Sequence, residues 1–407
     1  MSAVRVLVVH NAYQKAGGED SVVAAEIALL RRHGDTVIEL RRSNDEIEVA
    51  SGIARVRLAA KTLWSRASHA QALALIEQHR PDVVHVHNTF PLISPSLYWA
   101  CGQAGVPVVQ TLHNFRLACP QAMFLRDGTA CESCVGKRIA WPALAHGCYR
   151  DSRVQTAVVV GMLALHRGLG TFDTQVTRYI ALNAFCRTKF IAAGLPAQRI
   201  VIKPNFAEVP APRPDERAAT ARTGMLFVGR MAAEKGIDVL ARAWPVCTAP
   251  GRNEGAEMTL RVAGTGDAGA TLHALDGVTL LGWRSPAQVQ LEMHSALALV
   301  VPSVCFETFG LVVVEAFSAG LPVIASRIGA LAELIEEGVT GLLFEPGSAA
   351  DLARVMRWAA DHPLQMAAMG LRARLCFDAL YTPSINYRQL RAIYADAIEA
   401  RRDETCA

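Results

Sequence analysis

The chain of 407 residues is 51% hydrophobic, 6% aromatic and 19% charged. A single hydrophobic core stops growing at about 250–300 residues, so two domains are expected. This composition excludes disordered and fibrous chains and is typical of an α/β enzyme. The start of the chain lacks the pattern of a secretory signal, and the apolar run at 156–170 is shorter than the ~20 residues that span a bilayer. A cytoplasmic protein without a membrane span is therefore expected.

The net charge of +4 is unevenly divided along the chain. Residues 1–203 carry 23 Lys and Arg against 14 Asp and Glu, and residues 204–407 carry 18 against 23, which gives +9 and −5. The basic half favours an anionic partner. No basic run with interleaved aromatics and no zinc-finger spacing is present, which argues against nucleic acid. An anionic membrane surface or a phosphate-linked acceptor fits this charge better.

Short β-branched runs alternate with helix-like stretches in both halves of the chain. The expected strands of the first half are 5–10, 36–40, 82–87, 106–113 and 177–183. A proline-punctuated linker at 203–216 precedes the expected strands 225–230, 259–264, 278–282, 296–303, 321–326 and 341–344. The alternation predicts an α/β fold of two Rossmann-like, doubly wound domains whose strand ends face a cleft. The predicted domains are 1–203, with a cysteine-rich insertion at about 117–150, and 204–386, followed by a helix at 387–407.

Residues 51–78 place cations and apolar side chains at helical spacing. A basic amphipathic helix of this kind can lie in the headgroup plane of an anionic membrane. The alternative is a helix that packs its apolar stripe on the sheet and leaves its cations in water. The cations are Arg55, Arg57, Lys61 and Arg66, and the apolar residues are Ile53, Val56, Leu58, Leu63 and Trp64.

Histidines mark the strands of the first domain. His10 ends the first expected strand, His85 and His87 lie in the third, and His113 ends the fourth. Side chains at the carboxyl ends of parallel strands project toward the ligand-binding edge, whereas a histidine in mid-strand is more often part of the core. His113 is therefore a candidate catalytic residue, and His87 is a candidate for the acceptor site.

The insertion carries four cysteines with the spacing C-x(11)-C-x(2)-C-x(13)-C. In a reducing cytosol, four thiols with one CxxC pair favour a tetrahedral metal over disulfides. The surrounding segment lacks apolar periodicity, so a structural zinc ion would supply folding energy there. The alternative is four small buried hydrophobes. The candidate metal ligands are Cys119, Cys131, Cys134 and Cys148.

Two loops of the second domain carry candidate contacts to a nucleotide. Arg230 and Lys235 follow the first strand of this domain in VGRMAAEKG, where a guanidinium and an ammonium can neutralise a diphosphate. The alternative is a solvated basic pair. Gly264 and Gly266, in VAGTGDAG, and Arg284, in LGWRSP, are candidates for shaping a nucleotide pocket, although turn glycines and an exposed arginine are common.

The segment PSVCFETFGLVVVEAFSAGLPVIAS, 302–326, places Glu307 and Glu315 eight residues apart, with a helix start between them. Backbone N–H groups at the start of that helix form an anion site, and Gly310 permits close approach of a diphosphate. Carboxylates are acceptor-only, so Glu307 suits sugar hydroxyls and Glu315 suits the ribose diol. The alternative is that both glutamates are solvated. The helix-start residues are Phe309, Gly310 and Leu311.

The E-x(7)-E spacing and its flanking sequence resemble those of the retaining family-4 glycosyltransferases of GT-B fold, in the bacterial subgroup that shares HNFRLACP-like sequences and the four-cysteine insertion. The resemblance spans nearly the whole chain and is strongest at 225–345. It implies that His113 contacts the donor sugar and that Gly17 and Gly18 lie beneath the donor phosphates. It also implies that the C-terminal helix packs back on the first domain.

The resemblance implies a transferase that uses a UDP- or GDP-sugar as substrate and needs no catalytic cofactor. An acceptor hydroxyl attacks the front face of the sugar, and Arg230 and Lys235 stabilise the departing diphosphate. The acceptor is expected to be a saccharide or lipid-linked group in cell-surface polysaccharide or glycolipid assembly. A nucleotide-sugar epimerase of the same fold and a non-catalytic nucleotide-sugar-binding protein are the alternatives.

Overall fold

The computed structural model describes residues 3–14, 17–47, 52–208, 222–248 and 258–406. The chain divides into two compact units, which are described separately. The first unit contains residues 1–124, 132–205 and 386–407, and the second contains residues 125–131 and 206–385. Among the described residues, no helix is both long and apolar enough to cross a membrane.

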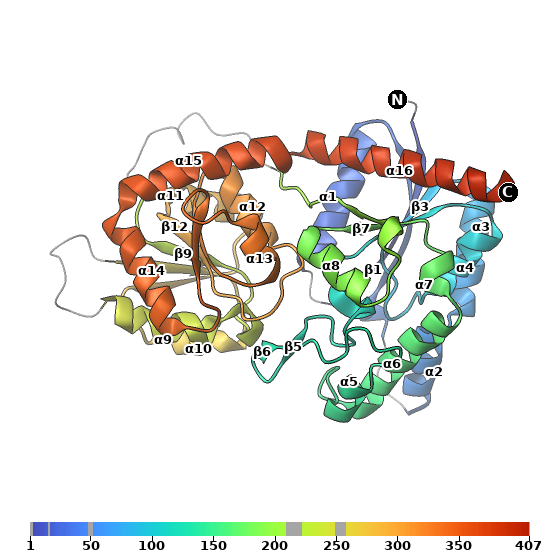
Figure 1. Ribbon diagram of the computed structural model, residues 1–407, viewed down its shortest axis with the longest axis horizontal. Coiled ribbons are helices and arrows are strands. Elements are labelled where there is room, and N and C mark those ends of the chain that lie inside the picture. The colour runs from blue at the N-terminus through green and yellow to red at the C-terminus, as the bar shows by residue number, and fades with distance from the viewer. Residues whose placement is uncertain (1–2, 15–16, 48–51, 209–221, 249–257, 407) are drawn as a thin grey trace. The chain divides into compact units, whose positions relative to one another are not determined.

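The first unit is built on a six-stranded parallel sheet in the order β2-β1-β3-β4-β7-β8. Its central strands β3 and β4 are fully buried and rich in valine, because helices cover the sheet (Figure 1). The parallel register places the carboxyl ends of β1, β3 and β4 at one edge of the sheet. The strands are β1 (Arg5–Ala12), β2 (Thr36–Ser43), β3 (Val83–Asn88), β4 (Val108–Thr111), β7 (Arg178–Ala181) and β8 (Ile200–Ile202).

One helix that the sequence predicts in the first unit is observed as two separate helices. Residues 52–79 form α2 and α3, and residue 51 lies outside the described residues. The helix is interrupted at Ser65, whose hydroxyl caps α3 by accepting from the backbone N–H of Ser68. Arg66 therefore lies on α3, apart from the three other cations. The helices are α1 (Gly18–Arg32), α2 (Gly52–Leu63), α3 (Arg66–His79), α4 (Ser96–Gln103), α5 (Trp141–His146), α6 (Arg153–Gly168), α7 (Thr171–Thr174) and α8 (Ala184–Ala192).

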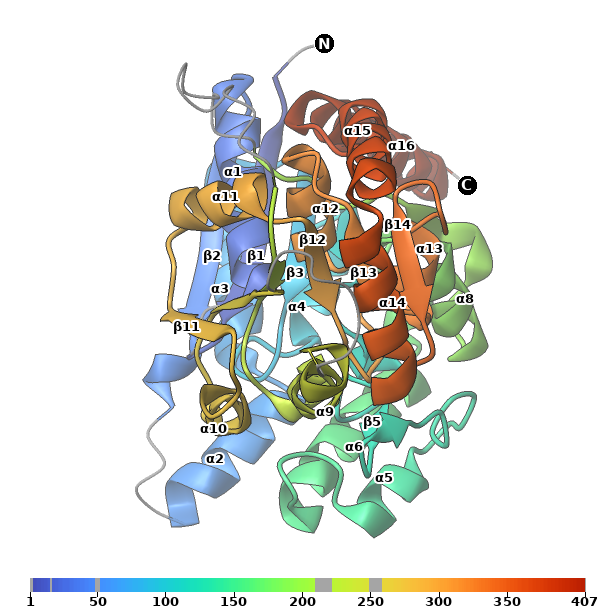
Figure 2. The same ribbon diagram turned by 90° about the vertical axis from the view of Figure 1, so that its left-hand side faces the viewer.

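The second unit repeats the architecture with a parallel sheet in the order β11-β10-β9-β12-β13-β14. Figure 2 shows α9 and α14 side by side on one face of this sheet. A two-stranded hairpin of β5 (Leu125–Arg126) and β6 (Thr129–Ala130) is grouped with this unit. The strands of the main sheet are β9 (Met225–Val228), β10 (Leu260–Ala263), β11 (Val278–Gly282), β12 (Ala298–Val301), β13 (Val323–Ser326) and β14 (Gly341–Phe344).

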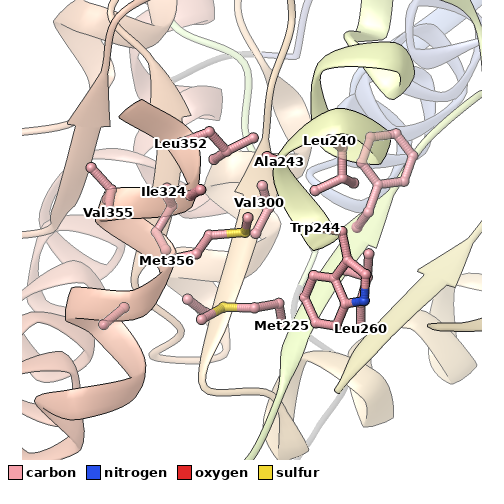
Figure 3. Packing of buried hydrophobic residues seen from close by; sticks show 14 of the residues in the cluster. Met225, Leu240, Ala243, Trp244, Leu260, Val300, Ile324, Leu352, Val355 and Met356 are labelled. Carbon is pink, nitrogen blue, oxygen red and sulfur yellow. The ribbon is translucent and has the colours of Figure 1, made fainter. Parts of the chain in front are cut away.

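The core of the second unit lies between its sheet and the α9–α14 layer. Trp244 of α9, Met225 of β9 and Met356 of α14 lie within this cluster (Figure 3). Trp244 is 1% exposed, and its indole N–H donates to the carbonyl of Asp276, so its one polar group is satisfied. The helices are α9 (Ile237–Thr248), α10 (Ala270–His273), α11 (Pro286–Ser295), α12 (Leu311–Ser318), α13 (Gly329–Leu334), α14 (Ala349–Asp361) and α15 (Pro363–Leu380).

The last helix, α16 (Pro383–Cys406), belongs to the first unit from Asn386 onward. Its residues Leu390, Tyr394 and Ala397 are fully buried in the same cluster as Val6 and Val8 of β1. Arg391 forms a buried ion pair with Asp35. The C-terminal segment therefore completes the core of the domain that the N-terminal segment begins.

Candidate active site

In the second unit, an ion pair joins two loops that follow parallel strands. The ammonium of Lys235, which comes after β9, lies 2.6 Å from Oε1 of Glu307, which comes after β12. The hydroxyl of Ser303 donates to the same oxygen at 2.7 Å. Two donors thus hold the Glu307 carboxylate in one orientation. Its second oxygen, Oε2, takes part in neither of these hydrogen bonds.

The ion pair shifts the pKa of both partners toward the charged forms. Burial alone would lower the pKa of Lys235, but the charge of Glu307 and the hydrogen bond to it leave that pKa raised. Burial would raise the pKa of Glu307, but Lys235 and the hydrogen bond from Ser303 leave it lowered. Both groups are therefore ionised near neutral pH, so Lys235 can attract an anion and Glu307 can accept hydrogen bonds from hydroxyl groups.

The loops beside this ion pair require glycine. A Cβ at Gly264 would lie 1.9 Å from the carbonyl oxygen of Gly229, and a Cβ at Gly266 would lie 2.2 Å from that of Met231. Both glycines also have positive φ, at 144° and 154°. Arg230, in the adjacent loop, is exposed and pairs with Glu234 at 2.7 Å. Arg284 follows β11 on a separate loop and is half-buried.

Helix α12 begins within the E-x(7)-E segment. Phe309 is buried before it, Gly310 is its N-cap with φ of 83°, and Leu311 is its first residue. Glu315 lies one helical turn further along, and burial raises its pKa to about 7. A carboxyl that titrates near 7 is sensitive to any ligand that donates hydrogen bonds to it. The helix start and Glu315 thus supply donors for an anion and an acceptor for a diol.

In the first unit, the start of α1 lies next to the end of β1. Gly17 is the N-cap of α1, and Gly18 is the first residue. The carboxylate of Asp20 accepts from the backbone N–H of Gly17 at 3.0 Å and lies 2.8 Å from Nε2 of His10. Glu19 accepts from Tyr13 at 3.1 Å and from Asn114 at 3.2 Å. Burial raises the pKa of Glu19 to about 7.

The strand-end histidines of β3 and β4 are in contact. Nδ1 of His87 lies 2.8 Å from Nε2 of His113, and the two rings are stacked with centroids 5.1 Å apart. Both line a small cavity of about 40 Å³ together with Asn114 and Arg116. The guanidinium of Arg116 lies 4.3 Å from the centre of the Phe90 ring. His113 therefore lies at the edge where the sequence placed it, and His87 lies directly behind it.

A cluster of buried polar side chains lies behind the histidines, and sequence patterns predict only some of its members. Nζ of Lys203 donates to Oε2 of Glu26 at 3.1 Å, and both side chains are at most 3% exposed. Sequence reasoning missed this pair and Ser303. The signal for Glu26 is its position on the apolar face of α1, four residues after Val22 and four before Leu30. A charged residue at such a position needs a buried partner.

Among the described residues, one trio of candidate metal ligands has ligand atoms within 4.8 Å of one another, namely Glu26, His85 and His87. The ammonium of Lys203 on the same carboxylate opposes a cation there, and Nδ1 of His85 lies 2.7 Å from the hydroxyl of Tyr394. These contacts favour a hydrogen-bonded cluster over a metal site.

The sulfur atoms of the four insertion cysteines do not form such a group, in which all ligand atoms lie within 4.8 Å of one another. Cys134 and Cys148 pack in a small apolar cluster with Ala143. Cys131 is grouped with the second unit, whereas Cys119, Cys134 and Cys148 are grouped with the first. The zinc site therefore stays a prediction from the sequence.

Two Rossmann-like units with polar strand-end loops are the architecture of the GT-B glycosyltransferases. The chain belongs to this group: the family described as "Glycosyltransferase Family 4" matches residues 16–209, and the one described as "Glycosyl transferases group 1" matches residues 222–362. The glycosyltransferase family expected from the E-x(7)-E motif is confirmed, and the retaining mechanism and the four-cysteine subgroup stay predictions.

Among curated proteins, the chain is 29% identical over 313 residues to glycogen synthase of Mycobacterium tuberculosis, covering 74% of this chain and 65% of that protein. It is 31% identical over 322 residues to D-inositol 3-phosphate glycosyltransferase of Nocardia farcinica, covering 72% and 61%. The chain thus spans less than two thirds of the length of these two relatives.

Two solved structures share the fold along nearly the whole chain. Anabaena HepE, solved with UDP and glucose, has a TM-score of 0.65 at 18% identity and covers 96% of this chain and 100% of its own. Sucrose-phosphate synthase of Thermosynechococcus elongatus has a TM-score of 0.70 at 19% identity, with coverage of 98% and 100%. These likenesses confirm the predicted GT-B fold.

Proposed function

We propose that the chain transfers a sugar from a nucleoside-diphosphate sugar to a hydroxyl acceptor. The observation that supports this most is the Lys235–Glu307 ion pair beside the start of α12. It combines a cation for the diphosphate with a carboxylate whose orientation is held for sugar hydroxyls. An epimerase is not favoured, because the relatives with assigned activities are transferases and synthases.

We propose that the transfer retains configuration. The acceptor oxygen forms a bond to the anomeric carbon on the face from which the diphosphate departs. The anomeric C–O bond to the diphosphate breaks, and the acceptor proton passes to a diphosphate oxygen. Lys235, Arg230 and the N–H groups at the start of α12 stabilise the negative charge that develops. This route needs no cofactor.

We infer that the donor nucleotide is a uridine diphosphate. Anabaena HepE, which has the same fold, was solved with UDP-glucose. Glu315 lies on α12 and, in this proposal, accepts hydrogen bonds from the two ribose hydroxyls, which UDP- and GDP-sugars both carry. His113 and the glycines at the start of α1 serve the sugar and its phosphates. GDP-sugars are the alternative donors.

We propose that the first unit meets an anionic membrane from the cytoplasmic side and that the acceptor is lipid-linked. Helix α6 packs against both α2 and α5 (Figure 1). Large apolar side chains of these helices face solvent instead of the sheet, namely Ile53 at 68%, Val56 at 70%, Trp141 at 61% and Val154 at 77% exposure. The cations of α2, Arg55, Arg57 and Lys61, are also exposed. Exposed apolar groups beside cations fit an anionic lipid surface.

Thermal unfolding with a panel of nucleotide sugars tests the proposed function. A ligand at 100 times its dissociation constant stabilises the folded state by about 2.7 kcal/mol. We expect UDP-sugars to raise the melting temperature and the best of them to release UDP when an acceptor is added. If no UDP- or GDP-sugar raises the melting temperature at millimolar concentration, the chain does not bind this class of donor.

A further inference from the structure

Two arginines of the first unit lie over one aromatic ring. The guanidinium carbons of Arg116 and Arg150 lie 5.2 Å and 5.6 Å from the centre of the Tyr149 ring. Arg116 also lies 4.3 Å from the centre of the Phe90 ring, and the Phe90 and Tyr149 rings are nearly perpendicular, with centres 5.7 Å apart. Cations at these distances are attracted to the faces of aromatic rings, so the rings hold both guanidinium groups close to each other.

This cluster of Phe90, Arg116, Tyr149 and Arg150 lies at the edge of the sheet that carries the candidate site. Phe90 follows β3, and Arg116 follows β4 in a short helical turn, 115–117. Arg116 and His113 line the same cavity of about 40 Å³. Ligands of parallel α/β sheets bind outside the carboxyl ends of the strands. A ligand at the cluster would therefore lie next to the residue that is proposed to serve the donor sugar.

The insertion supplies half of the cluster, and α6 holds the insertion in position. Tyr149 and Arg150 lie at the end of the insertion, shortly before α6. The backbone N–H of Tyr149 donates to the hydroxyl of Thr156, which is fully buried, at 2.9 Å. At the other end of the insertion, Arg167 of α6 donates to the carbonyl of Leu117 at 2.6 Å. The protein thus fixes the insertion where its aromatic ring meets Arg116.

Both guanidinium groups keep N–H groups that the described residues do not use. Nη1 of Arg116 donates to the carbonyl of Pro120 at 2.8 Å, which leaves Nε and Nη2 without a partner among those residues. These two nitrogens are not buried, so a ligand can reach them. Arg150 is exposed, and its side chain makes no hydrogen bond with any described residue. A guanidinium with unused N–H groups is a strong donor for an oxyanion.

The positive charge of the cluster is only weakly compensated. Among the described residues, no ion pair includes Arg116 or Arg150. Glu19 interacts electrostatically with Arg116, but burial raises the pKa of Glu19 to about 7, so this carboxyl is only partly ionised at neutral pH. Two cations near one ring repel each other, and a bound anion would replace that repulsion by attraction.

We propose that Arg116 and Arg150 form a subsite for a phosphate group carried by the acceptor, and that the insertion serves to build this subsite. The inference rests on the proposed function, in which the acceptor is lipid-linked and reaches the first unit. A guanidinium presents its N–H groups in a planar fork that matches two phosphate oxygens. The charge of +9 in residues 1–203 attracts the same kind of group. A neutral saccharide would engage neither cation.

Calorimetry of the full chain with inorganic pyrophosphate, in the presence of saturating UDP, tests the subsite. UDP fills the proposed donor site, so the pyrophosphate reports on binding elsewhere. We expect Arg116→Gln and Arg150→Gln each to raise the dissociation constant at least about tenfold, because each removes charge-assisted hydrogen bonds. Arg138→Gln is the matched control, because Arg138 is exposed in the same insertion, and it should bind pyrophosphate as the parent does.

Two further measurements sharpen the result. Arg116→Lys keeps the charge but loses the planar fork, so we expect it to bind more weakly than the parent and more tightly than Arg116→Gln. Farnesyl diphosphate distinguishes the two sources of the phosphate group. Tighter binding of farnesyl diphosphate than of pyrophosphate indicates a lipid-linked acceptor, and equal binding indicates a soluble phosphorylated one.

The subsite and the proposed function fail in different measurements. No binding of pyrophosphate by the parent, or equal affinity of the parent and both glutamine variants, would overturn the subsite and leave the two arginines as packing partners of the rings. Arg150→Gln keeps this test decisive if Arg116→Gln folds poorly, because Arg150 makes no hydrogen bond with the described residues. Binding of UDP-sugars needs neither arginine, so its failure would refute the proposed function alone.

Discussion

At the scale of single residues, the proposed donor site depends on charges that are compensated before a ligand arrives. Lys235 and Glu307 hold each other ionised, and Ser303 fixes the carboxylate. Such preorganisation lowers the cost of stabilising charge in a transition state, because the groups need not reorient during the reaction. Glu315 differs, since no ion pair of the described residues includes its carboxyl and burial keeps its pKa high.

Removing either partner of this ion pair should abolish transfer and leave the fold intact. We expect Lys235→Ala and Glu307→Ala each to lower kcat at least about a hundredfold, in line with the loss of one charge-stabilising group. The measurement is initial rate at saturating donor. Arg327→Ala is a matched control, because Arg327 forms an ion pair with Glu337 that is exposed on the same unit. Rates within a few-fold of the parent in both alanine variants would refute the assignment.

The raised pKa of Glu315 makes stability depend on pH. The folded state keeps this proton up to about pH 7, whereas the unfolded carboxyl loses it near 4.5, so Glu315 lowers the free energy of unfolding as pH rises through that interval. We expect Glu315→Gln to match the parent at pH 4 and to exceed its stability at pH 8 by up to about 3 kcal/mol. Chemical denaturation at both pH values measures the difference.

Glu307→Gln provides the contrast, because Lys235 lowers the pKa of Glu307. Its ionised form contributes stability above the unfolded pKa of 4.5. This variant should therefore lose stability at pH 8 relative to pH 4. The same sign of change in both variants would contradict the proposed difference between the two carboxyls.

At the scale of elements, the apolar side chains of α2 and α5 can have one of two roles, which are packing within the protein and contact with a membrane. The exposure of Ile53 and Val56 shows that the α2 stripe is not fully packed on the sheet. We expect the parent to float with anionic vesicles at low salt and a variant with Arg55, Arg57, Lys61 and Arg66 changed to glutamine to remain in solution. Each cation near an anionic surface contributes about 1 kcal/mol.

A Trp141→Ala variant distinguishes the contribution of apolar contact to membrane binding from that of charge, since Trp141 lies on α5 and carries no charge. Weaker flotation of this variant at low salt would support insertion of apolar groups. Equal flotation of the parent and the glutamine variant would mean that these cations do not contribute to membrane binding. Transfer to a soluble acceptor should be unaffected in all three proteins.

The insertion gives a test of its own. The sequence predicts about one zinc ion per chain at Cys119, Cys131, Cys134 and Cys148, the number expected of a four-ligand structural site. Elemental analysis of protein purified without added metal measures it, and a Cys131→Ser, Cys134→Ser variant should lose the ion. Substoichiometric zinc in the folded parent would favour the alternative of four small buried hydrophobes.

At the scale of the whole molecule, the two ends of the chain meet in one core. Val6 and Val8 near the N-terminus share a cluster with Leu390, Tyr394 and Ala397 of α16. Contacts of such high sequence separation carry a large loop-closure cost, which slows their formation. The core of the first unit is incomplete without the last helix.

Deleting residues 387–407 should destabilise the first unit more than the second. The deletion exposes apolar surface on β1 and leaves Asp35 without its buried partner Arg391. We expect loss of soluble protein or a first unfolding transition lowered by about 10 °C or more, since several kcal/mol are removed. Calorimetry measures it. An unchanged melting profile would mean that α16 contributes little to this core.

The sequence alone determined the fold class, and it predicted which loops of the second unit form the donor site. Strand runs such as 5–10 and the E-x(7)-E segment are local patterns, and local patterns specify which elements form and which loops follow them. The helix break at Ser65 escaped this reasoning, because the helical spacing continues across it and only the capping hydrogen bonds reveal it. The four-cysteine site remains open because spacing does not establish that the thiols meet.

Only the tertiary structure decided which side chains are partners. Lys235 and Glu307 are 72 residues apart, and Lys203 and Glu26 are 177 apart, yet each pair is in contact. His87 looked like a strand-end ligand, but it is 4% exposed and lies between Glu26 and His113. Contacts of this kind depend on sheet order and register, which bring distant strand ends to one edge. The sequence pattern shows that a buried charged residue needs a partner. The packing of strands and helices decides which residue that partner is.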